Sequence, residues 1–91
     1  MNHTELSVKT TITDLETKLD KNQNLYFKLS LRGFSNHFYA FSYNLSTETL
    51  TTLKEKPEQF INQLALISYQ ELPNKDNQGT FYKVKAIEII T

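Results

Sequence analysis

The sequence contains no cysteine, which excludes disulfides and thiolate metal sites and favours a reducing, cytoplasmic location. Its apolar runs are far shorter than the roughly 20 residues that a membrane-spanning helix needs. The first residues lack the basic and apolar segments of a signal peptide, so we expect none. We therefore expect a protein that is not attached to a membrane.

The sequence also lacks the groupings that catalysis requires. Its two glycines cannot build a phosphate-binding loop of the Walker type. His3 and His37 stand alone, and no cysteine nucleophile or cluster of metal-ligating side chains is present. We therefore predict no catalytic residue, no metal site and no cofactor, and we expect a protein that is not an enzyme.

Charge is balanced, because ten basic residues match ten acidic ones. A net charge of zero argues against a protein that binds nucleic acid by bulk charge. However, no acidic residue occurs between Asp20 and Glu48, whereas this stretch contains the basic residues Lys21, Lys28 and Arg32. If residues 25–43 form one surface, that surface should be locally positive.

The pattern of apolar residues predicts five strands and one helix. The strand at 25–32 alternates cleanly, with Leu25, Phe27, Leu29 and Leu31 on its inner face. Ser46 is an N-cap candidate for a helix in residues 46–62, with a further turn after Pro57. The other predicted strands are 6–19, with a bend near Asp14, 37–43, 64–72 and 80–90.

This order, β-β-β-α-β-β, is typical of an OB-fold. We therefore predict a mainly β fold: a five-stranded OB-fold barrel whose one helix lies between strands three and four. Residues 1–91 should form a single domain, with 1–5 as a flexible terminus. A cystatin-like or other α+β sheet is the alternative architecture.

Four stretches resemble OB-fold domains of bacterial and phage type that bind single-stranded nucleic acid. They are LYFKLSL at 25–31, FYAFS at 38–42, LISYQEL at 66–72 and GTFYKVKAI at 79–87. The sequence also resembles small OB-like accessory proteins that accompany a polymerase-type primase on mobile genetic elements. The resemblance implies single-stranded DNA binding or a replication-accessory role.

Aromatic and basic residues alternate on the second and third strands, as binding of single strands without sequence preference requires. The predicted stacking residues are Tyr26, Phe38 or Tyr39, and Tyr82. Phe27, Phe41 and Phe81 are expected in the core, although alternation does not decide which face of the third strand is inward. The predicted phosphate contacts are Lys28, Arg32, Lys75 in the polar loop 73–79, Lys83 and Lys85.

A protein-interaction module is the rival interpretation, because exposed aromatic residues also form interface cores. Such a module could be a subunit of a primase, polymerase or helicase complex, or a small inhibitor from a mobile element. The predicted partners are single-stranded nucleic acid, with DNA favoured, and a protein of a replication complex or a second copy of the chain.

Overall fold

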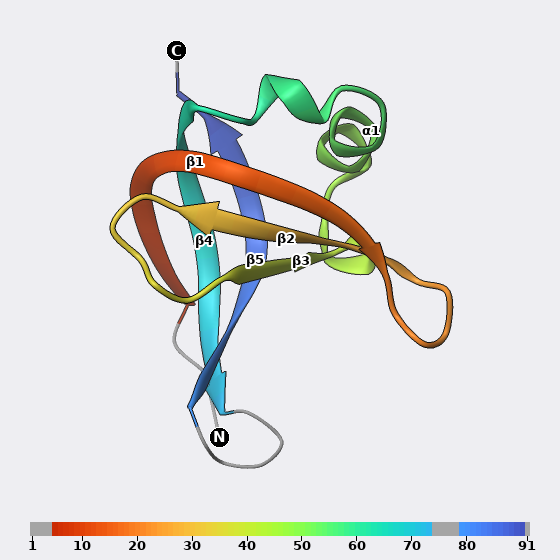
Figure 1. The fold of residues 1–91 in the computed structure, drawn as a ribbon, viewed down its shortest axis with the longest axis horizontal. Helices are drawn as coiled ribbons and strands as arrows, with labels where there is room; N and C mark the ends of the chain where they lie inside the picture. Colours follow the sequence, from red (N-terminus) through yellow and green to blue (C-terminus); the bar gives the residue numbers. More distant parts are fainter. Residues whose placement is uncertain (1–4, 74–78, 91) are drawn as a thin grey trace.

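The computed structural model describes residues 5–73 and 79–90, which form a closed barrel of five strands in the order β1-β2-β3-β5-β4 (Figure 1). One α-helix lies between the third and fourth strands, as the sequence predicts. The strands are β1 (Glu5–Leu19), β2 (Leu25–Leu31), β3 (Phe38–Phe41), β4 (Gln63–Pro73) and β5 (Thr80–Ile89), and the helix is α1 (Thr47–Glu55).

Strand β1 is long because it belongs to both sides of the barrel. Its first half pairs with β4 and its second half pairs with β2, both antiparallel. The register shifts between Ile12 and Asp14, which confirms the bend predicted near Asp14 and lets the strand curve around the barrel (Figure 1). Glu5, expected in the flexible terminus, already pairs with Gln70, whereas residues 1–4 lie outside the described part.

A short parallel seam between β3 and β5 closes the barrel. Its two register pairs join Phe38 to Tyr82 and Tyr39 to Lys83. Strand β3 ends at Phe41 and not at Tyr43 as predicted, because the chain turns there into a 3-10 helix, η1 (Ser42–Asn44). The seam is therefore the shortest pairing in the sheet.

The helix caps one end of the barrel. The backbone N–H of Thr49 donates to the Ser46 hydroxyl at 3.2 Å, which confirms Ser46 as the N-cap. Leu53 of α1 and Phe60, which follows the 3-10 helix η2 (Pro57–Gln59), are both buried in the barrel core. No helix of the described residues is long and apolar enough to cross a membrane.

The barrel interior holds the residues that alternation in β2 predicts to be inward. Phe27 and Leu29 are fully buried, Leu31 is nearly so, and Leu25 packs against them from the strand end. Burying a side chain of this kind contributes about 1.5–3 kcal/mol to the free energy of folding. The same alternation turns Tyr26, Lys28 and Ser30 outward. Burial of the apolar face of β2 therefore determines which side chains lie on its outer face.

Candidate nucleic-acid interface

Aromatic rings lie on both sides of the β3–β5 seam, and the inner group belongs to the core. Phe38 is fully buried, and its ring stacks on Tyr82 with centroids 4.8 Å apart. Tyr69 meets both rings edge-on, at 5.0 and 5.7 Å. Phe38 therefore cannot stack a base, and of the two alternatives predicted on β3 only Tyr39 can. Tyr82 faces the same inner group but is half-buried, and its role as a stacking residue stays a prediction.

The outer group is a cluster of five rings, which we call the outer ring cluster. Tyr39 stacks on Phe81 across the seam, with centroids 5.1 Å apart and planes 9° from parallel. Phe41 lies 5.9 Å from Phe81 and 5.6 Å from Tyr26. Its members are Tyr26, Tyr39, Phe41, Tyr43 and Phe81.

Two members of this cluster were expected in the core. Phe41 and Phe81 are instead half-buried on the outer side, in the same layer as Tyr39. The reason is the choice of inward face in β3: Phe38 and Ala40 point inward, so Tyr39 and Phe41 must point outward. Among the predicted stacking residues, Tyr26 and Tyr39 lie on the outer face.

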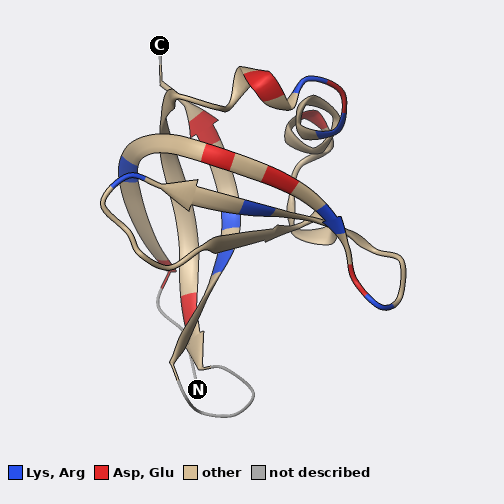
Figure 2. Cartoon of the chain, viewed as in Figure 1, with Lys and Arg blue, Asp and Glu red and all other residues tan. Residues whose placement is uncertain are grey.

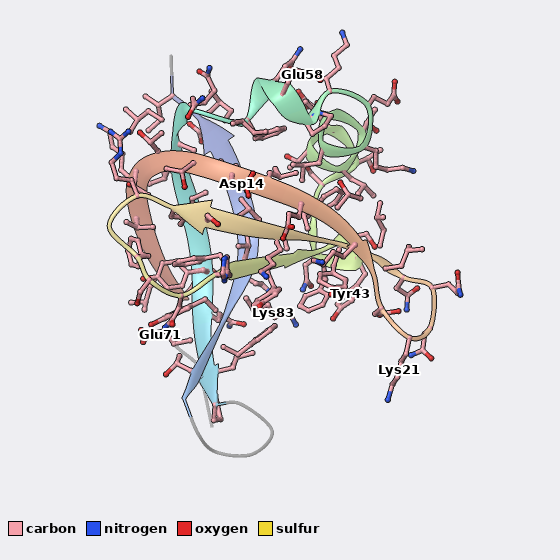
Figure 3. All side chains as sticks on the ribbon, viewed as in Figure 1. Asp14, Lys21, Tyr43, Glu58, Glu71 and Lys83 are labelled. Carbon is pink, nitrogen blue, oxygen red and sulfur yellow. The ribbon has the colours of Figure 1, made fainter. Side chains whose placement is uncertain are left out.

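Tyr43 extends the outer ring cluster beyond the end of β3. The residue is 68% exposed, and its ring stacks on Phe41 with centroids 5.7 Å apart. The Lys83 ammonium lies over this ring, 5.5 Å from its centroid, and the two side chains share one face of the molecule (Figure 3). Sequence reasoning missed Tyr43, although the spacing of Tyr39, Phe41 and Tyr43 carries the signal.

Lysines flank the outer ring cluster. The sheet register places Tyr39 between Lys28 on β2 and Lys83 on β5, with all three on the outer face. It also places Lys18 of β1 beside Tyr26, a neighbour that only the register reveals. Each of these cations is therefore close to a ring on which a base could stack.

The surface around Lys28 is not locally positive as expected, because β1 pairs with β2 along this face and brings its acids there. Glu16 is the register partner of Lys28, and its Oε2 lies 3.8 Å from the Lys28 Nζ. Asp14 lies two positions further along, opposite Ser30. Figure 2 shows the acidic segments of β1 beside the basic segment of β2. The surface is thus mixed in charge, and no uniform positive patch forms there.

The remaining predicted phosphate contacts are dispersed. Arg32 follows the end of β2, four residues and therefore about 13 Å along the strand from Lys28. Lys85 is half-buried, in the bulge of β5 that shifts the register with β4. Lys75 lies outside the described residues. The structure thus brings Lys28 and Lys83 to the rings and leaves Arg32 away from them.

Burial, and after it the charges of Glu71 and Tyr82, raises the pKa of Tyr69, which belongs to the inner group. Within residues 5–73 and 79–90, no three His, Asp or Glu side chains come together as a metal-binding group. What the outer face offers is therefore flat rings and flanking cations.

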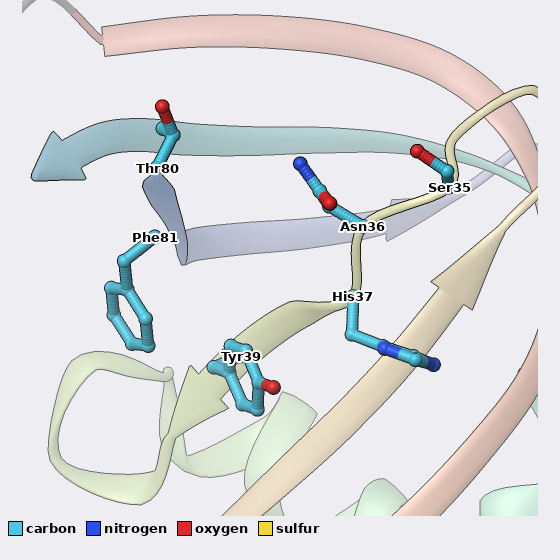
Figure 4. Close-up of a pocket in the computed structure, with 6 residues that line it drawn as sticks. All are labelled: Ser35, Asn36, His37, Tyr39, Thr80 and Phe81. Carbon is cyan, nitrogen blue, oxygen red and sulfur yellow. The ribbon is translucent and has the colours of Figure 1, made fainter. Parts of the chain in front are cut away.

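An open hollow of about 280 Å³ adjoins one end of the outer ring cluster (Figure 4). Tyr39 and Phe81 form one side of it. Its other lining residues, Ser35, Asn36, His37 and Thr80, come from the loop between β2 and β3 and from the start of β5. The hollow thus combines ring faces with hydroxyl and amide groups.

No protein-family model matches the sequence, and no curated protein does either. Two crystal structures of Rim1, a mitochondrial single-stranded DNA binding protein from S. cerevisiae, have a similar fold. One has a TM-score of 0.74 at 15% identity, covering all of this chain and 97% of that one. The other, labelled with selenomethionine, has a TM-score of 0.72 at 14% identity, covering 100% and 98%. The likeness, together with the strand order, confirms the predicted OB-fold.

Proposed function

We propose that the protein binds single-stranded nucleic acid, with DNA favoured, on the outer ring cluster, and that it does so without catalysis. The observation that carries the proposal is the group of five rings on the outer face, flanked by Lys18, Lys28 and Lys83. Flat rings accept successive bases, and the cations follow the phosphates. The proposal is supported by the similarity of the fold to that of Rim1, which is described as a single-stranded DNA binding protein.

A single copy should bind weakly. The net charge is zero, and Glu16 offsets the charge of Lys28, so few phosphate contacts are free of competition. Binding should rest mainly on stacking, at about 1–3 kcal/mol for each base. The expected salt dependence is correspondingly modest, at about 0.7 in log–log slope for each phosphate contact to a single strand.

The test is a fluorescence-anisotropy titration of a labelled oligothymidylate at low and at physiological salt. The parent should bind the single strand, and a duplex of equal length should bind less well. Tyr39→Leu keeps an apolar side chain in the sheet but removes the flat ring, so it should weaken binding by about 1–3 kcal/mol. The control is Leu19→Ala, which shortens an exposed apolar side chain outside the cluster. If the parent protein does not bind the oligonucleotide at low salt, the proposal is disproved. If the Tyr39→Leu variant is folded and binds as tightly as the parent, the outer ring cluster is not the binding site.

The outer face of β4 supports a second proposal, which is pairing with another copy of the chain. Leu64 and Leu66 of β4 are 39% and 36% exposed. The register places Leu66 between Lys9 of β1 and Glu88 of β5 on the same face. A two-fold axis parallel to β4 would bring Lys9 of one copy opposite Glu88 of the other, so this face complements itself.

Linking two weak binding faces in a dimer raises the apparent affinity without any new contact to the strand. Sedimentation velocity should show a dimer for the parent, a monomer for Lys9→Glu, and a restored dimer when Glu88→Lys is added. A parent that stays monomeric at all concentrations contradicts this pairing. The protein partner in a replication complex that the sequence suggests stays a prediction.

A further inference from the structure

The hollow beside Tyr39 and Phe81 differs chemically from the rest of the outer face. The outer ring cluster offers ring faces, which every base can use. The hollow adds a primary amide from Asn36 and hydroxyl groups from Ser35 and Thr80. Its volume, about 280 Å³, is just below the roughly 300–1,000 Å³ that small-molecule sites occupy. It therefore suits one heterocycle and not a longer segment of strand.

The Asn36 side chain is placed to read such a ring. Its amide points toward the strand end that carries Thr80 and Phe81, whereas the His37 ring turns away toward β2 (Figure 4). Within the described part of the chain, no hydrogen bond engages this amide. It thus presents an acceptor oxygen and a donor nitrogen side by side, next to a ring pair that could hold a base by its face.

We propose that the hollow is a base-reading subsite, in which one adenine stacks beside Tyr39 and Phe81 and forms two hydrogen bonds with the Asn36 amide. An asparagine amide pairs bidentately with N6 and N7 of adenine, donating to N7 and accepting from N6. On the edge that carries N7 in purines, thymine presents only the O4 acceptor beside its methyl group, and guanine presents two acceptors, so neither forms this pair there. This inference rests on the proposed function, because it assigns one nucleotide position on the same surface.

Such a subsite would fix the position of the protein along the nucleic-acid strand. The outer ring cluster alone would accept any sequence at every position, so the protein could slide freely. A single adenine in the hollow fixes which nucleotides meet Phe41 and Tyr43 at the other end of the cluster. Sequence preference should therefore appear at one position and be absent at the others.

The experiment uses the full chain and oligonucleotides of about eight nucleotides, within the roughly 4–16 that an OB-fold covers. An all-thymidine oligonucleotide is compared with a set in which one adenine occupies each position in turn. At the preferred position, adenine should tighten binding by about fivefold, the low end of the discrimination that a bidentate pair provides. Asn36→Ala should remove this preference, and it should weaken binding of the all-thymidine strand much less than binding of the adenine-containing strand.

The control is Asn22→Ala, in the exposed turn between β1 and β2, which removes the same amide away from the hollow. If oligothymidylate binds and adenine gives no preference at any position, the subsite is disproved and the proposed function stands. If Asn36→Ala weakens both oligonucleotides equally, the amide does not read the base, and the subsite is likewise disproved. If the parent binds no single strand at all, the proposed function fails and the subsite fails with it.

Discussion

Replacing Glu16 by glutamine should strengthen binding to a single strand. Glu16 and Lys28 are partners across β1 and β2, with 3.8 Å between Oε2 and Nζ and side-chain exposures of 50% and 27%. At that distance two unit charges attract by about 1 kcal/mol in water, and measured exposed pairs contribute about 0–1 kcal/mol. A phosphate that approaches Lys28 must compete with this attraction and also meets the charge of Glu16.

Removing the carboxylate charge releases Lys28 for the phosphate. We expect Glu16→Gln to raise the association constant at low salt by up to about fivefold, which corresponds to about 1 kcal/mol. The log–log salt slope should steepen by about 0.7, as one phosphate contact requires. Salt-dependent anisotropy titrations measure both quantities, and urea unfolding should show a change in stability of less than about 1 kcal/mol.

The matched control is Asp14→Asn, which changes the net charge equally on the same face of β1 but lies opposite Ser30. Asp14→Asn should change the log–log salt slope of binding much less than Glu16→Gln does. Adding Lys28→Ala to Glu16→Gln should abolish the gain. If Glu16→Gln and Asp14→Asn tighten binding equally, the effect is one of overall charge. Lys28 then makes no phosphate contact, and the reasoning is refuted.

Three further predictions follow from burial and exposure. Tyr43→Ala should weaken strand binding by about 1–3 kcal/mol while leaving the free energy of unfolding within about 0.5 kcal/mol, since the residue is 68% exposed. Phe38→Ala should lower the free energy of unfolding by about 3–5 kcal/mol in urea titrations, because the ring is fully buried. Burial, then the charge of Glu71, raises the pKa of Tyr69, so its stabilisation is present below pH 10.0 and is lost as the pH rises through the raised value. Tyr69→Phe should therefore flatten the alkaline loss of stability, measured by urea titrations on either side of that pH.

The sequence predicted the barrel because the elements that define it carry local signals. Strand β2 has one apolar and one polar face, so its alternation alone assigns Phe27 and Leu29 to the core. Ser46 marks the start of the helix by its capping chemistry. These signals depend only on neighbours along the chain, which a sequence displays directly.

The site was predicted less completely, because it depends on which strands lie beside each other. Strand β3 has aromatic residues on both faces, so only its packing in the barrel shows that Phe38 is inward and Tyr39 outward. The pairing of Glu16 with Lys28 depends on a register set across a turn, and no local pattern encodes it. The outer position of Phe81 similarly depends on the parallel seam with β3.

The short β3–β5 seam is where we expect the barrel to open locally. Strands β3 and β5 meet through two register pairs, fewer than the four of the β2–β3 ladder and the nine of the β4–β5 ladder. Local opening takes place where pairing is least extensive, so the seam amides should be the first of the sheet to exchange with solvent. A nucleic-acid strand stacked on both Tyr39 of β3 and Phe81 of β5 would contact both sides of the seam and oppose separation of the two β-strands. Binding of the strand and closure of the barrel would then be coupled, and a bound strand would stabilise the fold by RT ln(1 + [L]/Kd), which grows with the logarithm of the strand concentration.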